Sequence, residues 1–192
     1  MIRGGNNAWD VLGAADEVCS AEAAAAAVSR VAREITTRLE SCHPLLLGVM
    51  RGSIVFAGHL LPLLRFPLEF DYLDVTRYGD ALRGGDVAWR VTPASLLAGR
   101  VVLVLDDILD EGHTLALIRK HILSAGAAAC YSAVFADKDL GRPKPVTADF
   151  VGVTVPNRYV FGFGMDVRGA WRNLPAVYAL KDNDEQGAQS AG

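Results

Sequence analysis

The stretch VVLVLDDILDEGHTL, residues 101–115, joins an apolar run to four carboxylates and then to a helical pattern. The apolar run predicts a buried strand, and HTLALIRKHILSAG at 113–126 predicts a helix that ends at Gly126. CYSAVFA at 130–136 predicts a second buried strand. Strand, helix and strand in this order are typical of a parallel βαβ unit, so we expect an α/β protein.

The acids lie where a sheet of this kind binds its ligands. In an open parallel sheet ligands bind beyond the carboxyl ends of the strands, and Asp106 and Asp107 follow such an end. Gly112 permits a sharp turn, and the free N–H groups of the helix start attract an anion, to which Thr114 adds a hydroxyl. Phosphate beside carboxylates is repelled unless the ligand also brings hydroxyls or a cation. A phosphorylated sugar with Mg²⁺ meets both conditions, so the loop predicts a sugar-phosphate site.

A simpler interpretation is an ordinary helix N-terminus, where negative charge is favourable. It explains Asp110 and Glu111 well, but it explains Asp106 and Asp107 poorly, because adjacent acids beside a buried core need partners. No G-x-x-x-x-G-K-[ST] motif is present. The segment GFGMDV at 162–167 is a broken G-x-G-x-x-G that follows no clear strand–helix unit, and we discount it.

Composition restricts the class of protein. A chain of 192 residues suits one domain, and 51% hydrophobic with 21% charged residues excludes disorder. The net charge of −3 provides no basic surface for nucleic acid. Three scattered cysteines (Cys19, Cys42 and Cys130) without a C-x-x-C indicate free thiols. No apolar run is long enough to span a membrane and the first residues lack a signal-peptide core, so we expect a cytoplasmic protein without membrane or nucleic-acid partners.

The other elements follow from periodicity and turn residues. We expect a helix at 20–41 capped by Ser20, a strand at 44–50, a helix at 52–64, a half-buried strand at 68–78, a Gly-rich charged loop at 79–87 and extended chain at 88–93.

The acidic loop resembles the phosphoribosyl-pyrophosphate signature of type I phosphoribosyltransferases: an apolar strand, two acids, two apolar residues, Asp, any residue, Gly, any residue and Thr. Four other segments resemble the hypoxanthine-guanine branch in the same order: GVMRGSIVFAGHL (48–60), DYLDVTRYGD (71–80), FADKDLGRPKP (135–145) and DFVGVTVPNRYVFGFGMD (149–166). The resemblance spans about residues 45–180.

This resemblance implies the type I phosphoribosyltransferase fold, a central parallel sheet flanked by helices with a small hood subdomain. It implies one domain over 1–180, with a core at about 40–147, a hood built from the N-terminal region and 148–180, and a flexible tail at 181–192. It also implies purine salvage, in which phosphoribosyl pyrophosphate and a 6-oxopurine give a nucleotide and pyrophosphate. Mg²⁺ is the implied cofactor, and a homodimer or homotetramer is the implied assembly.

The resemblance assigns the sugar-phosphate and metal contacts. Asp106 and Asp107 would bind the ribose hydroxyls and Mg²⁺, with Asn157 near a second Mg²⁺. The 5′-phosphate would bind the loop of Asp110, Glu111, Gly112, His113 and Thr114. The pyrophosphate would lie by Arg51 and Gly52, where the family has a peptide that is often cis, and Arg142 would be a second contact to it. Residues 77–87, with Tyr78, would form a lid.

It also assigns the base contacts. Asp110 would be the catalytic residue that exchanges a proton with purine N7. Lys138 would reach the exocyclic oxygen, Phe150 would stack on the ring and the Val151 backbone would meet the base edge. An ammonium only donates, so Lys138 suits a 6-oxo group and mismatches the 6-amino group of adenine.

Several alternatives stay open at this point. Lys138 could also be a solvated lysine in a loop, and Arg51 could be an ordinary surface residue. His113 could be a solvated residue at a helix start, and Phe150 could belong to the core. For the whole chain, the alternatives are a non-catalytic regulator that senses phosphoribosyl pyrophosphate or nucleotides, and a transferase for another base such as a pyrimidine.

The chain departs from the family pattern at four positions. Glu111 replaces a small hydroxyl residue, and its carboxylate would repel the 5′-phosphate unless it points away or pairs with a cation. Arg51 stands where lysine is common, Asn157 where aspartate is frequent, and Arg77 where a small residue often precedes the lid tyrosine.

Overall fold

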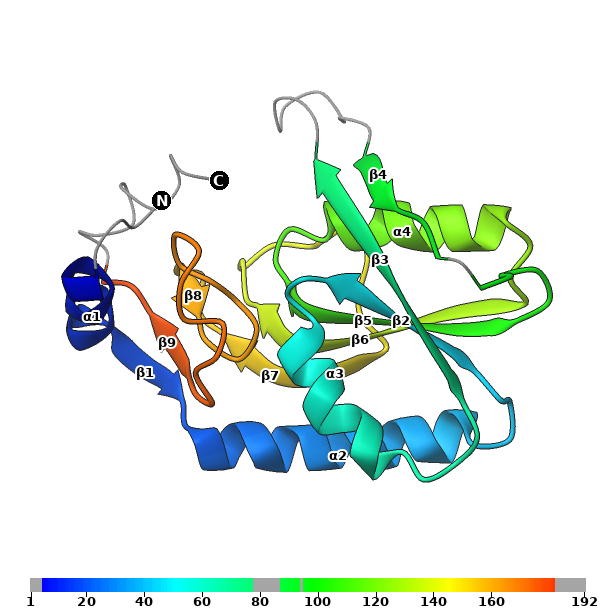
Figure 1. Ribbon diagram of the computed structural model, residues 1–192, viewed down its shortest axis with the longest axis horizontal. Coiled ribbons are helices and arrows are strands. Elements are labelled where there is room, and N and C mark those ends of the chain that lie inside the picture. Colours follow the sequence, from blue (N-terminus) through cyan, green and yellow to red (C-terminus); the bar gives the residue numbers. More distant parts are fainter. Residues whose placement is uncertain (1–4, 78–86, 94, 182–192) are drawn as a thin grey trace.

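The computed structural model describes residues 5–77, 87–93 and 95–181. In this part of the chain, six strands form one sheet in the order β4-β3-β2-β5-β6-β7, and three form a second sheet in the order β1-β9-β8 (Figure 1). The strands are β1 Asp16–Cys19, β2 Leu45–Met50, β3 Glu69–Arg77, β4 Val87–Val91, β5 Val101–Leu109, β6 Ala129–Lys138, β7 Phe150–Val155, β8 Val160–Phe161 and β9 Val177–Ala179. The helices are α1 Gly5–Ala14, α2 Ala21–Leu39, α3 Ile54–Leu60, the 3-10 turn η1 Leu61–Leu63 and α4 His113–Ser124.

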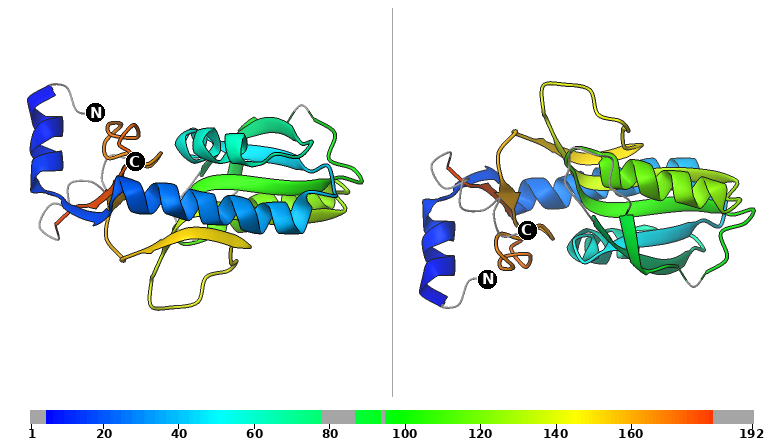
Figure 2. Two further views of the ribbon diagram at one scale, coloured as in Figure 1. Left: turned by 90° about the horizontal axis from the view of Figure 1, so that it is seen from below. Right: turned by 90° about the horizontal axis from the view of Figure 1, so that it is seen from above.

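The six-stranded sheet carries the main core. It is parallel from β3 to β7, and only β4 pairs antiparallel, at the edge. Helices α2 and α3 pack on one face and α4 on the other (Figure 2). Burial on both faces explains the continuous apolar run at residues 101–105, the first part of β5. The predicted βαβ unit of β5, α4 and β6 is therefore confirmed.

Helix α2 lies along the main sheet. Ser20 caps it, since its hydroxyl accepts a hydrogen bond from Ala23 N at 3.2 Å, as predicted. Its buried side chains, such as Val31 and Ile35, pack in the same cluster as Phe135 of β6 and Phe150 of β7.

The border between core and hood differs from the expected one. β7 pairs with β6, so the segment 150–155 belongs to the main sheet and the hood begins after Val155. Helix α2 also belongs to the core, because its apolar face packs on the main sheet.

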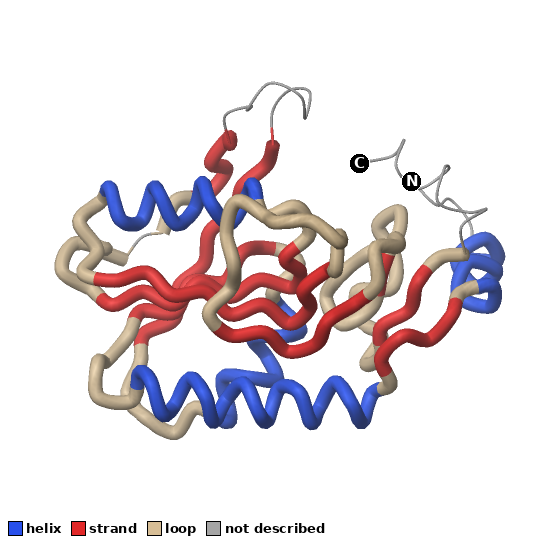
Figure 3. Tube along the Cα trace, turned by 180° about the vertical axis from the view of Figure 1, so that it is seen from behind, coloured by secondary structure: helices blue, strands red, loops and turns tan. Residues whose placement is uncertain are grey.

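The hood is the three-stranded sheet together with α1, beyond one end of the main sheet (Figure 3). Its small core holds Phe161, Val167 and Leu180, with Leu12 of α1 packed against them. β1 pairs with β9, which joins chain segments about 160 residues apart. The segment that follows β8 lies over the carboxyl end of β5, beside Gly52 and Asp107. In the described part of the chain, no helix is both long and apolar enough to cross a membrane.

Candidate active site

A cavity of about 200 Å³ lies between the carboxyl ends of β5 and β6 and the hood. Its walls are Asp107, Ile108, Asp110, Lys138, Tyr159, Val160, Met165, Asp166 and Arg172. Ligands of open parallel sheets bind at this end of the strands, so the cavity lies where the sheet topology predicts a site.

Two adjacent acids lie near the carboxyl end of β5, which continues past them to Leu109 instead of ending before them as predicted, and Asp107 lines the cavity. Asp107 N donates to Asp106 Oδ1 at 2.9 Å, and Ile108 N donates to Asp107 Oδ1 at 2.8 Å. Burial raises the pKa of Asp106 well above its ordinary value, and the charge of Asp107 raises it further. Burial also raises the pKa of Asp107, while the Arg172 guanidinium opposes that rise. Two desolvated carboxyl groups favour a ligand that brings a cation or hydroxyl donors.

The donor set fits Mg²⁺ when substrate oxygens complete it. Mg²⁺ is usually bound through one or two carboxylates together with substrate phosphates and water, and Asp106 and Asp107 offer such a pair. Across the described residues, no cluster of three or more His, Cys, Asp or Glu side chains is arranged to hold a metal. Asn157 is exposed in the bend after β7, and its role near a second Mg²⁺ stays a prediction.

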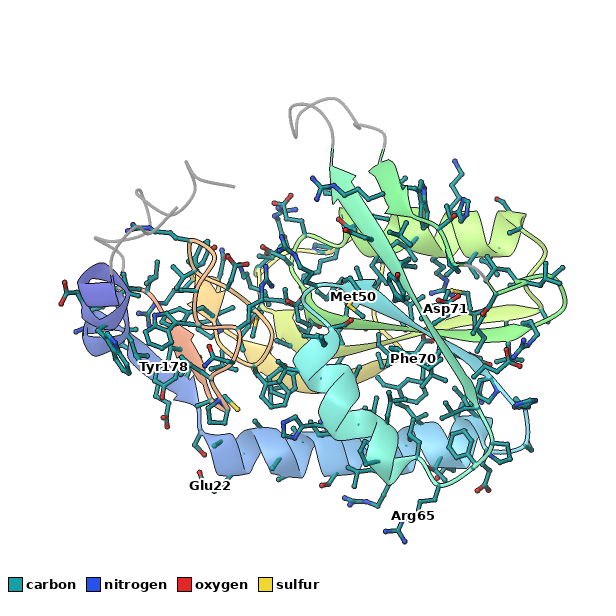
Figure 4. The ribbon with its side chains drawn as sticks, in the orientation of Figure 1. Glu22, Met50, Arg65, Phe70, Asp71 and Tyr178 are labelled. Atoms are coloured by element: carbon teal, nitrogen blue, oxygen red, sulfur yellow. The ribbon has the colours of Figure 1, made fainter. Side chains whose placement is uncertain are left out.

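The loop after β2 lies directly against these acids. The peptide between Met50 and Arg51 is cis, and Met50 ends β2 beside α3 (Figure 4). Gly52 is buried, and a Cβ atom there would lie 2.0 Å from Asp107 Oδ2. A glycine is therefore required at this position, while the neighbouring Arg51 is exposed.

The loop between β5 and α4 has the geometry of an anion site. Gly112 is the N-cap of α4 with φ +84°, so the chain turns sharply into the N-terminus of the helix, where the backbone N–H groups and the helix dipole favour an anion. Glu111 Oε1 lies 3.0 Å from Arg142 Nη2, and Glu111 Oε2 lies 3.7 Å from His113 Nε2. The unusual carboxylate of this loop is thus paired with a cation.

An ion pair connects the candidate proton acceptor with the candidate base-reading residue. Lys138 Nζ lies 3.1 Å from Asp110 Oδ2. The Lys138 side chain is only 12% exposed, so it is a cavity residue and not a solvated loop lysine. A donor and an acceptor therefore lie side by side on one wall.

The hood contributes a second cation. Arg172 Nη1 donates to Gly164 O at 2.7 Å and lies 3.9 Å from Asp107 Oδ2, and Arg172 Nη2 donates to Asp166. Gly164 has φ +105°, and a Cβ atom there would lie 2.2 Å from Gly52 O. The hood thus touches the loop after β2 backbone to backbone.

Comparison with known proteins identifies the family. The family model for the phosphoribosyl transferase domain matches residues 14–168. A hypoxanthine-guanine phosphoribosyltransferase from Bacillus subtilis is 32% identical over 155 residues, which cover 80% of this chain and 86% of that protein. The bifunctional protein TilS/HprT of Listeria monocytogenes is 36% identical over 155 residues, 80% of this chain, but the match spans only 24% of its length.

A solved structure agrees with these matches. It is a mutant hypoxanthine phosphoribosyltransferase from Trypanosoma cruzi in a ternary substrates complex, with a TM-score of 0.82 and 27% identity. The superposition covers 89% of this chain and 98% of that one. The chain belongs to the type I phosphoribosyltransferases. Within that family it is similar to the hypoxanthine-guanine branch, and the predicted fold class is confirmed.

In this phosphoribosyltransferase the structure brings most predicted site residues together. Asp106 and Asp107 adjoin the cavity that Asp110 and Lys138 also line. A neighbouring group surrounds the phosphate loop and comprises Glu111, Gly112, His113, Thr114 and Arg142.

Two predicted base contacts lie elsewhere in this phosphoribosyltransferase. Phe150 is 8% exposed and packs in the main core cluster, and Val151 O accepts a hydrogen bond from Arg30 Nη2 at 2.8 Å. A base that used the Val151 carbonyl would have to compete with Arg30, so the stacking and base-edge roles stay predictions. Tyr78 and most of the lid at 77–87 lie outside the described residues.

The hood residues of this phosphoribosyltransferase site were not predicted. Tyr159, Met165, Asp166 and Arg172 line the cavity from segments after β7. The signal for three of them was present, because they lie in or beside the segment that includes GFGMDV, whose glycines indicate close backbone approach. No sequence signal identifies Arg172.

Proposed function

We propose that this phosphoribosyltransferase is a purine salvage enzyme that transfers the 5-phosphoribosyl group from phosphoribosyl pyrophosphate to hypoxanthine or guanine. The products are the nucleotide and pyrophosphate. The observation that supports this proposal best is the cavity in which Asp107, Asp110 and Lys138 converge, with a helix N-terminus beside it.

The sugar would bind at the acids and the phosphate loop. Asp106 and Asp107 accept hydrogen bonds from the ribose hydroxyls, and the N–H groups that follow Gly112 hold the 5′-phosphate. Bound Mg²⁺ would supply charge neutralisation for the leaving pyrophosphate. Arg172 faces Asp107 from the hood and adds a fixed positive charge at that end of the substrate.

The base would bind at the ion pair. O6 and N7 lie on the same edge of a 6-oxopurine, so one edge meets Lys138 as donor and Asp110 as acceptor. Asp110 takes the proton from N7 as the purine nitrogen attacks the glycosidic carbon from the face opposite the leaving group. A 6-amino group would place a donor against the ammonium of Lys138, which disfavours adenine.

A panel of bases tests the proposal. Steady-state rates with hypoxanthine, guanine, xanthine and adenine are compared with and without Mg²⁺. We expect Mg²⁺-dependent nucleotide formation from 6-oxopurines, with adenine at least about 100-fold poorer in kcat/KM. The variant Lys138→Gln, whose amide both donates and accepts, should narrow that gap.

Other outcomes would select the rival functions. Binding of phosphoribosyl pyrophosphate without turnover of any base would support a non-catalytic sensor. That alternative is not favoured, because the matched relatives are named as transferases. A preference for pyrimidines would contradict the role of Lys138.

The assembly and location are also part of this proposal. We place the enzyme in the cytoplasm as a homodimer or homotetramer, and the three cysteines, which are unpaired in the structure, agree with a reducing compartment. Sedimentation velocity would measure the assembly, and a monomer at assay concentrations would contradict it.

A further inference from the structure

Helix α1 holds the hood segment that carries Arg172. Trp171 precedes Arg172, and its Nε1 donates to Ala8 O of α1 at 2.8 Å. Its ring also meets Trp9 of α1 edge to face, with 4.8 Å between the ring centroids and 70° between the planes. The residue next to a cavity cation is therefore fixed from outside the cavity by a different element.

The adjacent side chains of Trp171 and Arg172 contact different parts of the molecule. Trp171 contacts α1, whereas Arg172 donates to Gly164 O and approaches Asp107. Gly164 N also donates to Arg172 O at 2.9 Å. A rotation of the backbone at Trp171 would therefore change the direction of the Arg172 guanidinium.

The backbone at Trp171 needs such support. Its φ of +71° is a conformation that bulky residues rarely adopt, and it persists only where neighbouring contacts stabilise it. Ala8 of α1 and residues 169–173 line a cavity of about 380 Å³, and Trp171 connects the two through the hydrogen bond and the ring pair. The family match begins at residue 14, so the helix that provides them lies almost wholly before it.

We propose that Trp171 is a positioning residue, and that α1, through Ala8 and Trp9, sets the orientation of Arg172 toward the pyrophosphate end of the substrate. The inference rests on the proposed function, in which Arg172 faces that pyrophosphate. It makes α1 a determinant of phosphoribosyl-pyrophosphate affinity and leaves the base contacts at Lys138 and Asp110 unaffected.

The test uses the full chain with Trp9→Ala, Trp9→Phe and Trp171→Phe. The dissociation constant of Mg²⁺-pyrophosphate is measured by calorimetry, and the KM values for phosphoribosyl pyrophosphate and base by steady-state kinetics. We expect pyrophosphate affinity to fall about threefold in Trp9→Ala and about tenfold in Trp171→Phe, with Trp9→Phe near the parent value. Thermal unfolding midpoints and the KM for the base should stay near those of the parent.

A matched control comes from the hood itself. Tyr178 of β9 stacks on Phe161 at 5.8 Å between ring centroids, in the hood sheet (Figure 4). Tyr178→Phe removes a hydroxyl from a hood aromatic whose ring partner is Phe161, whereas the ring partner of Trp171 is Trp9, so this variant should leave pyrophosphate affinity unchanged.

Two results would overturn the inference. One is pyrophosphate affinity within twofold of the parent in both Trp9→Ala and Trp171→Phe. The other is an equal loss for pyrophosphate and base, which would indicate a merely structural role. The variant Arg172→Gln distinguishes a failure of this inference from a failure of the proposed function. If Arg172→Gln also leaves pyrophosphate affinity intact, the assignment of Arg172 to the pyrophosphate fails. If Arg172→Gln weakens pyrophosphate binding and the Trp variants do not, only the inference about α1 fails.

Discussion

The contact between Gly52 and Asp107 permits a quantitative test of the site. In Gly52→Ala the new methyl group would lie 2.0 Å from Oδ2 and 2.4 Å from Cγ of Asp107. The carboxylate must then move by roughly 1 Å to reach an ordinary nonbonded distance. That movement pulls it away from Ile108 N, to which it is hydrogen-bonded at 2.8 Å. A misplacement of this size at a positioning group costs on the order of 100-fold in rate, or about 2.7 kcal/mol.

The assay is kcat/KM for phosphoribosyl pyrophosphate at saturating Mg²⁺, together with the dissociation constant of the same substrate. Gly58→Ala in α3 is the matched control, because a Cβ atom at Gly58 would meet nothing within 4 Å. That variant should keep full activity and gain about 0.5–1 kcal/mol in the free energy of unfolding, since alanine is the better helix former.

One result would refute the reasoning. If Gly52→Ala has the thermal midpoint of the parent and keeps kcat/KM within about threefold, a displaced Asp107 carboxylate is tolerated. Asp107 would then not be a ligand of the ribose or of Mg²⁺, and the assignment of the acid pair would have to be abandoned.

Three further predictions test neighbouring groups. Asp110→Asn keeps the shape but removes the proton acceptor, so kcat should fall about 10²- to 10⁴-fold while calorimetry shows unchanged binding of phosphoribosyl pyrophosphate; equal losses of both would contradict its role. Glu111→Thr removes a carboxylate from the phosphate loop and releases Arg142, so the KM for phosphoribosyl pyrophosphate should fall about threefold, whereas a rise would mean that the ion pair is needed to shape the loop. Because burial raises the pKa of Asp106, its ionised fraction falls as the pH drops through that raised pKa, and Mg²⁺-dependent substrate binding should weaken there. Between the ordinary pKa and this raised pKa, folded Asp106 holds a proton that the unfolded chain has released. The free energy of unfolding of the substrate-free protein should therefore fall, relative to Asp106→Asn, as the pH rises through this range, and chemical unfolding at several pH values measures it.

The main sheet could be predicted because its signals are local. β5 opens with a continuous apolar run at residues 101–105, which two acids follow, and α4 begins directly after Gly112 and shows helical spacing. Burial on both faces of a parallel sheet produces such runs, so composition over a few residues was sufficient. The cap at Ser20 was predictable for the same reason, since it depends on a neighbour three residues away.

The hood could not be predicted in the same way. β8 has two residues and β9 has three, which is too short for an alternating pattern to appear. β1 becomes a strand only through its pairing with β9, and α1 packs against the resulting small core. Tertiary contacts over long separations decide these elements, and no local propensity reports them.

The same distinction explains which site residues were found. Asp106, Asp107 and Asp110 lie on one short segment, whose chemistry is readable as a unit. Arg172 enters the cavity only because the hood folds back over the main sheet, so its neighbours in the sequence say nothing of its role.

The glycines of the discounted segment 162–167 acquire a meaning once the hood is in place. Gly164 is needed because a Cβ atom there would lie 2.2 Å from Gly52 O, so any side chain would collide with that backbone. Gly52 in turn is needed because Asp107 occupies the space of a Cβ atom. The hood therefore contacts the loop after β2, and that loop contacts Asp107. A side chain at either glycine would displace its neighbour and so shift the Asp107 carboxylate. A glycine in such a segment need not wrap a phosphate; here both glycines bring backbone and carboxylate into contact, and that contact determines where the substrate's sugar can bind.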